Sequence, residues 1–216
     1  MIELTYSLVS DGSSDVALLP LLSWLLRENG VKCAVQARLA DLRRLPDPPR
    51  DLRDKIRLAL DLYPCDLLFV HRDAEKQSLD QRKNEIHEAI NAPPAVAPPW
   101  VCVIPIRMTE AWLLFDETAI RHAAGNRSGR QSLALPGLME LESLPDPKTV
   151  LHELLRQASG LHGRRLKQFR ATQSALRVSS LITDFSPLRQ LSAFRTLESA
   201  LQVVIESAGW AIAIGT

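Results

Sequence analysis

The first half of the chain alternates between strand patterns and helix patterns, an order typical of a parallel α/β sheet. The clearest strand is the continuous apolar run 66–71 (DLLFVH), which has the pattern of a strand buried on both faces. It follows a helical pattern at 50–63, where apolar residues share one face and charged residues the other. Further strands are predicted at 2–9, 31–39 and 100–106, and further helices at 15–27 and 79–91. We therefore expect an α/β fold with a parallel sheet of about four strands, flanked by helices that form right-handed crossovers.

The second half has a different pattern, because helical periodicity dominates it. A proline-rich segment, 93–99 (PPAVAPP), predicts a rigid linker before the fourth strand. In the last predicted helix, Ser186 is a candidate N-cap and Pro187 a first-turn residue. The helices predicted in this half lie at 108–122, 148–159, 166–182 and 188–208. We expect an α/β domain over residues 1–123 and a mostly helical C-terminal region over 124–216 that packs on it.

Composition excludes several classes of protein. The 216 residues carry 26 Lys and Arg against 25 Asp and Glu, and the resulting net charge of +1 excludes a uniformly basic coat protein or an acidic tail. Aromatic residues make up only 5% of the chain, so we do not expect an aromatic stacking platform for single strands. The cysteines Cys33, Cys65 and Cys102 are odd in number and widely spaced, which predicts small buried thiols in a reducing compartment.

The chain also shows no signal for a membrane. Its N-terminus has no basic region followed by an apolar run, so no signal peptide is visible. The longest apolar stretch, 16–26, is shorter than the ~20 residues that a spanning helix needs. These features predict a cytoplasmic protein with no membrane partner.

Acidic residues follow three of the predicted strands. Asp11 and Asp15 come after the first strand, Asp73 and Glu75 after the third, and Glu110 after the fourth. Ligands bind at the carboxyl ends of the strands in an open parallel sheet, so these side chains should converge on one edge. Converging carboxylates repel one another unless a cation lies between them. Hard oxygen ligands of this kind suit Mg²⁺ or Mn²⁺, and two such ions can support phosphodiester hydrolysis.

Each of these positions also has a purely structural interpretation. Asp15 could favour the positive end of the first helix, and the acids after the third strand could cap the helix that follows. Glu110 could form a buried salt bridge with Arg107 or Arg72. His71, which ends the third strand, is more typical of a residue that hydrogen-bonds a carboxylate than of a general base.

Several strings of the sequence resemble one family. VSDGSSD, followed by a helix, resembles the first motif of TOPRIM domains, and DLLFVHRDAE resembles the second, a buried strand that ends in an acidic pair. Three later strings resemble a TOPRIM-like family of bacterial proteins often associated with ATPases of the OLD (overcoming lysogenisation defect) type. These strings are MTEAWLLFD, DPKTVLHELL and SPLRQLSAFRTLESAL.

The resemblance implies a metal-dependent nuclease centre, a separate ATPase that acts in trans, and a role in phage or plasmid defence. By position, Asp11 stands where the first motif has its Glu, and Asp15 matches the second acidic residue of that motif. Asp73 and Glu75 match the acidic pair, and Glu110 the acidic residue of the EAW string.

The chain departs from this pattern in two places. Asp11 is shorter than the Glu of the first motif. The register of the acidic pair is open: either Asp73 is its first member and Glu75 its second, or Asp73 is its second member and His71 replaces the first. Glu ligates magnesium well, whereas His suits Mn²⁺ or Zn²⁺ better, so the first register favours activity and the second puts it in doubt.

A basic stretch in the helical half is the second candidate functional feature. Residues 156–177 contain six basic residues and no acidic one. Such a stretch is either a solvated helix face or a surface that contacts phosphate, because Lys and Arg neutralise backbone charges. Together with two residues at the strand ends, the candidate phosphate contacts are Arg72, Arg107, Arg164, Arg165, Lys167 and Arg170.

The leading hypothesis is a TOPRIM-type nuclease that depends on Mg²⁺ or Mn²⁺ and cleaves DNA or RNA. Its predicted catalytic residues are Asp11, Asp73, Glu75 and Glu110, and Asp15 joins them as a metal ligand. The partners expected are nucleic acid and a separate OLD-type ATPase, since the chain has no phosphate-binding P-loop of its own; the formation of a homo-oligomer stays open. One alternative is a catalytically degenerate TOPRIM-like module that docks an ATPase, and another is a small-molecule phosphohydrolase.

Overall fold

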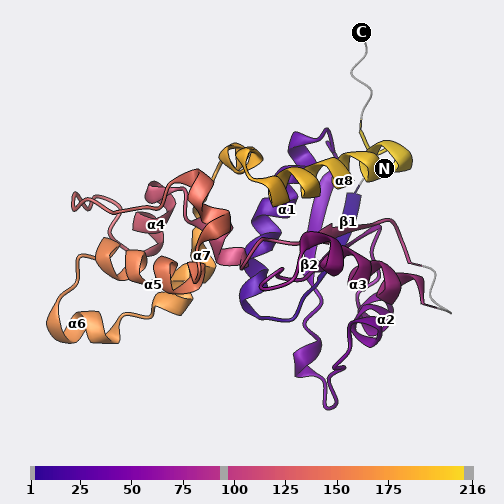
Figure 1. Cartoon of the computed structure of the whole chain (residues 1–216), viewed down its shortest axis with the longest axis horizontal. Helices are drawn as coiled ribbons and strands as arrows, with labels where there is room; N and C mark the ends of the chain where they lie inside the picture. Colours follow the sequence, from indigo (N-terminus) through magenta and orange to yellow (C-terminus); the bar gives the residue numbers. More distant parts are fainter. Residues whose placement is uncertain (1–2, 93–96, 212–216) are drawn as a thin grey trace, which may run out of the picture.

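The computed structural model describes residues 3–92 and 97–211 (Figure 1). Its centre is a sheet of four parallel strands in the order β2-β1-β3-β4. This confirms the predicted α/β class with a parallel sheet and a helical C-terminal part. The strands are β1 (Glu3–Val9), β2 (Ala34–Leu39), β3 (Leu67–His71) and β4 (Trp100–Val103).

Helices surround the sheet and form the second half of the chain. The α-helices are α1 (Leu18–Glu28), α2 (Leu52–Leu62), α3 (Leu79–Asn91), α4 (Glu117–Ala123), α5 (Pro147–Ala158), α6 (Gly163–Gln168), α7 (Ala171–Leu181) and α8 (Ser192–Ala208). Short 3₁₀ helices lie at η1 (Ser14–Ala17), η2 (Leu42–Arg44), η3 (Thr109–Leu113), η4 (Leu138–Ser143) and η5 (Ser186–Gln190). No helix within 3–92 and 97–211 is long and apolar enough to cross a membrane.

The two faces of the sheet bury separate apolar clusters, which explains the continuous apolar run of β3. Leu67 and Phe69 point to the face covered by α1 and α8. Leu68 and Val70 point to the opposite face, where they pack with residues of α2 and α3. Because successive strand residues face opposite sides, a strand covered on both faces is apolar at every position.

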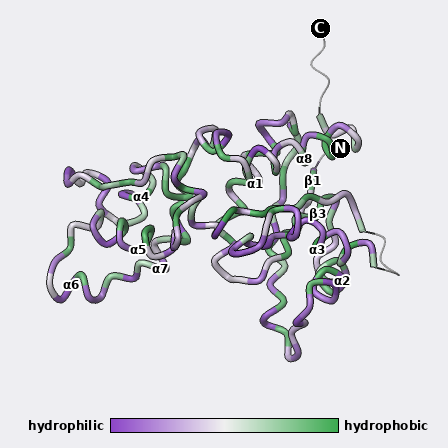
Figure 2. Tube along the Cα trace, in the orientation of Figure 1, coloured by the Kyte–Doolittle hydropathy of each residue, from purple (hydrophilic) through white to green (hydrophobic). Residues whose placement is uncertain are grey.

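The helical part continues the first of these clusters. Helices α4, α5 and α7 pack against one another to one side of the sheet (Figure 1), and the last helix, α8, returns to contact β4. Trp112 from η3 and Phe194 from α8 are both fully buried, and their rings meet edge to face at 5.6 Å. Figure 2 shows hydrophilic residues along α6 at the far end of this part.

Two predicted helices are each divided in two. Residues 108–122 form η3 and α4, because the Asp116 side chain accepts a hydrogen bond from the Ala119 N–H and starts α4 anew. Residues 166–182 form α6 and α7, because Phe169 has extended backbone geometry that interrupts the helix. The periodicity was continuous across both breaks, so the sequence pattern alone missed them.

The start of the last helix also differs from the prediction. Ser186 does not act as an N-cap; instead, the Asp184 carboxylate accepts hydrogen bonds from the Ser186 N–H and hydroxyl. Helix α8 begins at Ser192, where the Glu142 carboxylate from η4 accepts the first N–H groups. Most of the predicted linker, residues 93–96, and the first residue of the predicted strand 2–9 lie outside the described residues.

Candidate functional site

The carboxyl ends of β1 and β3 meet at the middle of the sheet edge. From β1 the chain crosses to β2 on one side, whereas β3 continues to β4 on the other. This reversal is the topological switch point at which open α/β sheets bind ligands. The turns after β1, β3 and β4 therefore lie along one edge, as the sequence predicted. Between the first two of these turns lies a cleft of about 310 Å³, whose lining includes Asp11, Asp15, His71, Asp73 and Glu75.

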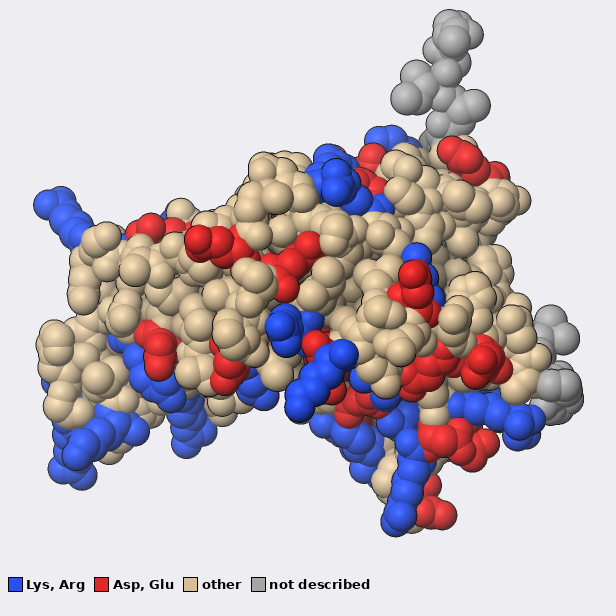
Figure 3. All heavy atoms as spheres, in the orientation of Figure 1, with Lys and Arg blue, Asp and Glu red and all other residues tan. Residues whose placement is uncertain are grey.

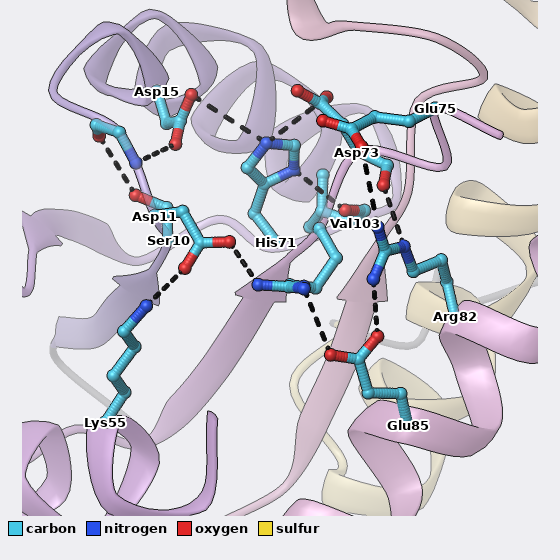
Figure 4. Close-up of polar contacts among 12 residues, drawn as sticks. Ser10, Asp11, Asp15, Lys55, His71, Asp73, Glu75, Arg82, Glu85 and Val103 are labelled. Atoms are coloured by element: carbon cyan, nitrogen blue, oxygen red, sulfur yellow. Dashed lines mark hydrogen bonds and ion pairs between the residues drawn. The ribbon is translucent and has the colours of Figure 1, made fainter. Parts of the chain in front are cut away.

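Three side chains converge at this cleft and are called here the acid–histidine cluster: Asp15, His71 and Asp73 (Figure 4). The His71 Nε2 atom lies 3.8 Å from Asp15 Oδ1 and 3.5 Å from Asp73 Oδ1. His71 and Asp73 stand two residues apart and share one face of the extended chain. The structure thus pairs Asp73 with His71, which corresponds to the second of the two registers left open by the sequence.

Hydrogen bonds on the other ring nitrogen orient His71. Its Nδ1–H donates to the Val103 carbonyl at 2.9 Å, since a carbonyl oxygen can only accept. This leaves Nε2 facing the two carboxylates, with Thr109 Oγ1 at 3.3 Å. An imidazole that donates one N–H to a backbone carbonyl and presents its other nitrogen to a cleft has the arrangement common among metal-binding histidines.

Asp73 is held in the cleft by the extension of the β3–β4 ladder. The Ala74 N–H donates to the Pro105 carbonyl at 3.0 Å, which fixes the backbone on either side of the carboxylate. Burial raises the pKa of Asp73 to about 6; the charge of His71 opposes that rise, while Asp15, Glu110 and Glu75 add to it. Its Oδ1 atom is buried and has no hydrogen-bond partner among the described residues.

Asp15 is positioned by the turn that follows β1. Its side chain is almost fully buried, and its Oδ2 accepts a hydrogen bond from the Gly12 N–H at 2.8 Å. A side chain at Gly12 would bring a Cβ atom to 3.2 Å from Oδ2, so this close approach favours glycine. The turn leaves Oδ1 directed toward His71 (Figure 4).

Asp11 points away from the acid–histidine cluster and is neutralised by two cations (Figure 4). Its Oδ1 lies 2.5 Å from Lys55 Nζ on α2, and its Oδ2 accepts a hydrogen bond from Arg72. Burial of Asp11 opposes its ionisation, but the hydrogen bond from Lys55 and the charge of Arg72 outweigh it and hold the pKa of the carboxyl below its ordinary value. The structure therefore separates Asp11 from the other predicted metal ligands.

Glu75 and Glu110 lie further out on the same edge. Glu75 is mostly exposed, has a left-handed backbone with a φ of 51°, and approaches Arg82 at 3.9 Å. Within the described ranges Glu110 forms no ion pair, neither with Arg107 nor with Arg72, although it lies near enough to affect the pKa of Asp73. Arg107 also has a left-handed φ, of 75°. Left-handed non-glycine residues at two neighbouring strand ends indicate backbone strain of the kind that gathers at functional sites.

Four residues of this region escaped sequence reasoning. Arg82 donates from Nε to the Asp73 carbonyl and pairs with Glu85, which in turn binds Arg72 at 3.1 Å. Lys55 reaches Asp11 from 44 residues away, and Thr109 approaches His71 from the fourth strand end. Only the Arg82–Glu85 pair follows a local pattern, the i,i+3 spacing within α3. The other contacts depend on how the helices pack beside the sheet.

The side chains of the cluster are spaced more widely than the ligands of a bound divalent cation. Among the residues that the structure describes, no group of three or more His, Cys, Asp or Glu side chains is placed so that it could hold a metal ion. Ligands at 2.0–2.1 Å on one octahedral ion stand roughly 3 Å apart, so the 3.5 and 3.8 Å separations are wider by less than about 1 Å. Asp73 Oδ1, which has no hydrogen-bond partner among the described residues, and His71 Nε2, which faces it, are donor types that suit a cation, although their separation is wider than in a formed site.

The predicted phosphate contacts fall into two separate places. Arg72 lies at the acidic edge, where Asp11 and Glu85 bind it. Arg107 follows β4 at the same edge. The other four lie on α6 and at the start of α7, in the part of the molecule farthest from β2 (Figure 1). Lys and Arg atoms gather over α6 at the lower left of Figure 3. These exposed residues are Arg164, Arg165, Lys167 and Arg170.

Comparison of the chain with protein-family models, with curated proteins and with solved structures found no match.

Proposed function

We propose that this protein hydrolyses phosphodiester bonds of nucleic acid with the help of a divalent cation bound at the acid–histidine cluster. One observation carries the proposal: Asp15, His71 and Asp73 converge at the switch point of a parallel sheet, and the buried Asp73 Oδ1 has no hydrogen-bond partner among the described residues. Buried polar atoms are normally satisfied, so an orphan in a cleft points to a missing ligand.

The cation would be held by Asp15, His71 and Asp73, with Glu75 and Glu110 near enough to add negative charge. Mg²⁺ and Mn²⁺ are the candidate ions, and the imidazole favours Mn²⁺. When bound, such an ion supplies Lewis-acid stabilisation of phosphate oxygens and lowers the pKa of a bound water. Arg82 and Thr109 would keep the Asp73 backbone and the His71 ring in place.

The test compares cleavage by three forms of the chain in Mg²⁺ and in Mn²⁺. Labelled single-stranded DNA, duplex DNA and RNA serve as substrates. We expect Asp73→Asn to lose about 10²-fold or more of the rate, because the substitution removes a charged ligand without changing shape. Asp61→Asn, an exposed acid on α2, is the matched control and should keep the full rate. Absence of metal-dependent cleavage by the unaltered chain, alone and with a candidate ATPase, would refute the proposal.

A second candidate function is a docking module without catalysis, related by the sequence resemblance to proteins that work with OLD-type ATPases. The neutralisation of Asp11 by Lys55 and Arg72 favours it, because this removes one of the predicted metal ligands. Under this alternative, calorimetry with Mn²⁺ gives no heat of binding. A complex with the ATPase would then survive alanine substitution of Asp15 and Asp73.

A further inference from the structure

The charges of the helical part are arranged differently from those of the sheet edge. Residues 154–183 contain no acidic residue. None of the six basic residues in this segment forms an ion pair with an acid anywhere in 3–92 or 97–211. Their charge is therefore available to an external anion, and the six are Arg156, Arg164, Arg165, Lys167, Arg170 and Arg177.

Three of these six basic residues line a groove between α6 and α7, together with one aromatic ring. The volume of the groove is about 480 Å³, and its lining includes Arg165, Arg170 and Arg177 together with Phe169. Phe169 is half-buried at the break between the two helices, so one side of its ring packs on the core while the rest borders the groove. Gln168 and Gln173 add amide groups that can both donate and accept hydrogen bonds.

We propose that this groove binds single-stranded nucleic acid, with the three arginines on successive phosphates and a base against Phe169. The inference rests on the proposed function in one respect, because it names the form of the polymer that the acidic cleft would receive. Single strands present unstacked bases to aromatic side chains, whereas a duplex hides its base faces. The low aromatic content argues against a platform of several rings, and this groove needs only one.

The same residues disfavour a lipid surface. A helix that lies in a membrane interface needs an apolar face opposite its basic one. Helix α6 has no such exposed face, since Arg164, Arg165, Lys167 and Gln168 are its exposed long side chains. The large exposed apolar residues in the described ranges, Leu62, Met139 and Val203, lie on other elements.

The path between the groove and the acidic cleft follows α7. Arg170, the N-cap of α7, and Arg177, within α7, both line the groove, and this helix packs against η1, which carries Asp15. An 11-residue helix is roughly 16 Å long at 1.5 Å per residue, a short distance for a polymer. A strand held in the groove is therefore placed close to the cluster that would act on it.

The experiment measures binding in EDTA, so that it does not depend on catalysis. Fluorescence anisotropy follows labelled 20-mer single-stranded DNA and RNA, and a 20-bp duplex, over a range of salt concentrations. We expect single strands to bind at least ~10-fold more tightly than the duplex. The variant R165Q/R170Q/R177Q should weaken single-strand binding at least ~10-fold and reduce the slope of log Kd against log salt by about 2, at ~0.7 per phosphate.

Two further variants make the result specific. Phe169→Leu keeps the charge and should weaken binding by ~10-fold with the salt slope unchanged. The triple variant R27Q/K32Q/R195Q removes the same charge from exposed residues outside the groove and should bind normally. Circular dichroism checks that each variant is folded.

The inference is overturned if both triple variants weaken binding equally, or if the duplex binds as tightly as the single strand. It is also overturned if polyglutamate displaces the labelled strand as well as unlabelled single-stranded DNA does. Asp73→Asn separates this inference from the proposed function. That variant should bind single strands as the unaltered chain does, so a chain that binds but never cleaves refutes only the proposed function. A chain that cleaves while the groove variants bind normally refutes only the inference.

Discussion

The sheet edge and the α6–α7 groove both carry many charged residues, but only the edge balances them internally. At the edge, Arg72 is shared by Asp11 and Glu85, and Arg82 binds Glu85. In the groove, arginines stand exposed without an acidic partner among the described residues. Internal ion pairs hold side chains in one arrangement, whereas unpaired exposed cations remain available for counter-charges. The contrast indicates that ion pairs fix the side chains of the cleft, whereas the arginines of the groove are available to bind an anion.

The edge is also the more strained of the two regions. Burial raises the pKa of Asp73, and its Oδ1 atom has no hydrogen-bond partner among the described residues. Two non-glycine residues, Glu75 and Arg107, have left-handed backbones. Functional sites commonly contain such unfavourable features, which lower the stability of the protein. The surrounding apolar core compensates for this destabilisation.

The largest effect should come from the core that joins the two regions. Phe194→Ala removes a fully buried ring that meets Trp112, and we expect it to lower the free energy of unfolding by about 3–5 kcal/mol. Urea denaturation followed by tryptophan fluorescence and by circular dichroism measures this loss. Both signals should change in one shared transition, because one apolar cluster spans the sheet and the helical part.

The matched control for that variant is Val203→Ala on the same helix. Val203 is 62% exposed, so its truncation should change stability by less than about 0.5 kcal/mol. Two separate transitions, with only one of them moved by Phe194→Ala, would show that the two regions fold independently.

The next effect concerns the strain at Asp73. Its pKa in the folded protein is about 6, above its ordinary value of 3.8, so the folded state binds the proton more tightly than the unfolded state. The contribution of Asp73 to the free energy of unfolding is therefore fully present below about pH 4 and is lost as the pH rises through 6. Asn cannot ionise, so Asp73→Asn abolishes this pH dependence. The change in the free energy of unfolding caused by the substitution should therefore be about 2–3 kcal/mol more favourable at pH 8 than at pH 4.

Urea melts in EDTA at the two pH values measure this difference. Asp61→Asn, at an exposed position, should show the same small effect at both. If Asp73→Asn is equally destabilising at pH 4 and pH 8, the Asp73 carboxylate is not under the strain described here.

The smallest effect compares a paired arginine with an unpaired one. Arg72→Ala leaves Asp11 and Glu85 with fewer partners and should cost about 1 kcal/mol of stability, because both ion pairs are only partly buried. Arg165→Ala in the groove should change stability by less than about 0.5 kcal/mol. Thermal melts at low and high salt measure both, and salt should reduce only the loss caused by Arg72→Ala. The contrast between paired and unpaired charges fails if both variants melt alike.

Much of the fold was predictable from local patterns. The run DLLFVH predicted β3, and the polar helix 79–91 was predicted with the bounds that α3 has. In the structure a capping box at Ser78 stabilises the start of that helix. Prediction failed where two helices met without a turn signal, at Asp116 and at Phe169. There, a side-chain cap and an extended residue interrupt a periodicity that continues on both sides.

The candidate site was predictable only in part. The sequence placed acidic residues after three strands, and the strand order brings those three turns to one edge. The sequence did not decide between the two registers of HRDAE, because each register pairs residues two apart, and His71, Asp73 and Glu75 would all share one side of an extended chain. In the structure Asp73 lies beside His71, whereas Glu75 is mostly exposed and has a left-handed backbone.

What the sequence determined by itself was therefore local: the strand and helix segments, the acidic turns and the basic stretch at 156–177. Only the tertiary structure decided which charges neutralise one another. It placed Lys55 on Asp11 across 44 residues and left the basic residues of α6 and α7 without acidic partners among those described. The physical reason is that periodicity and capping act over a few residues, whereas burial and ion pairing depend on segments brought together by folding.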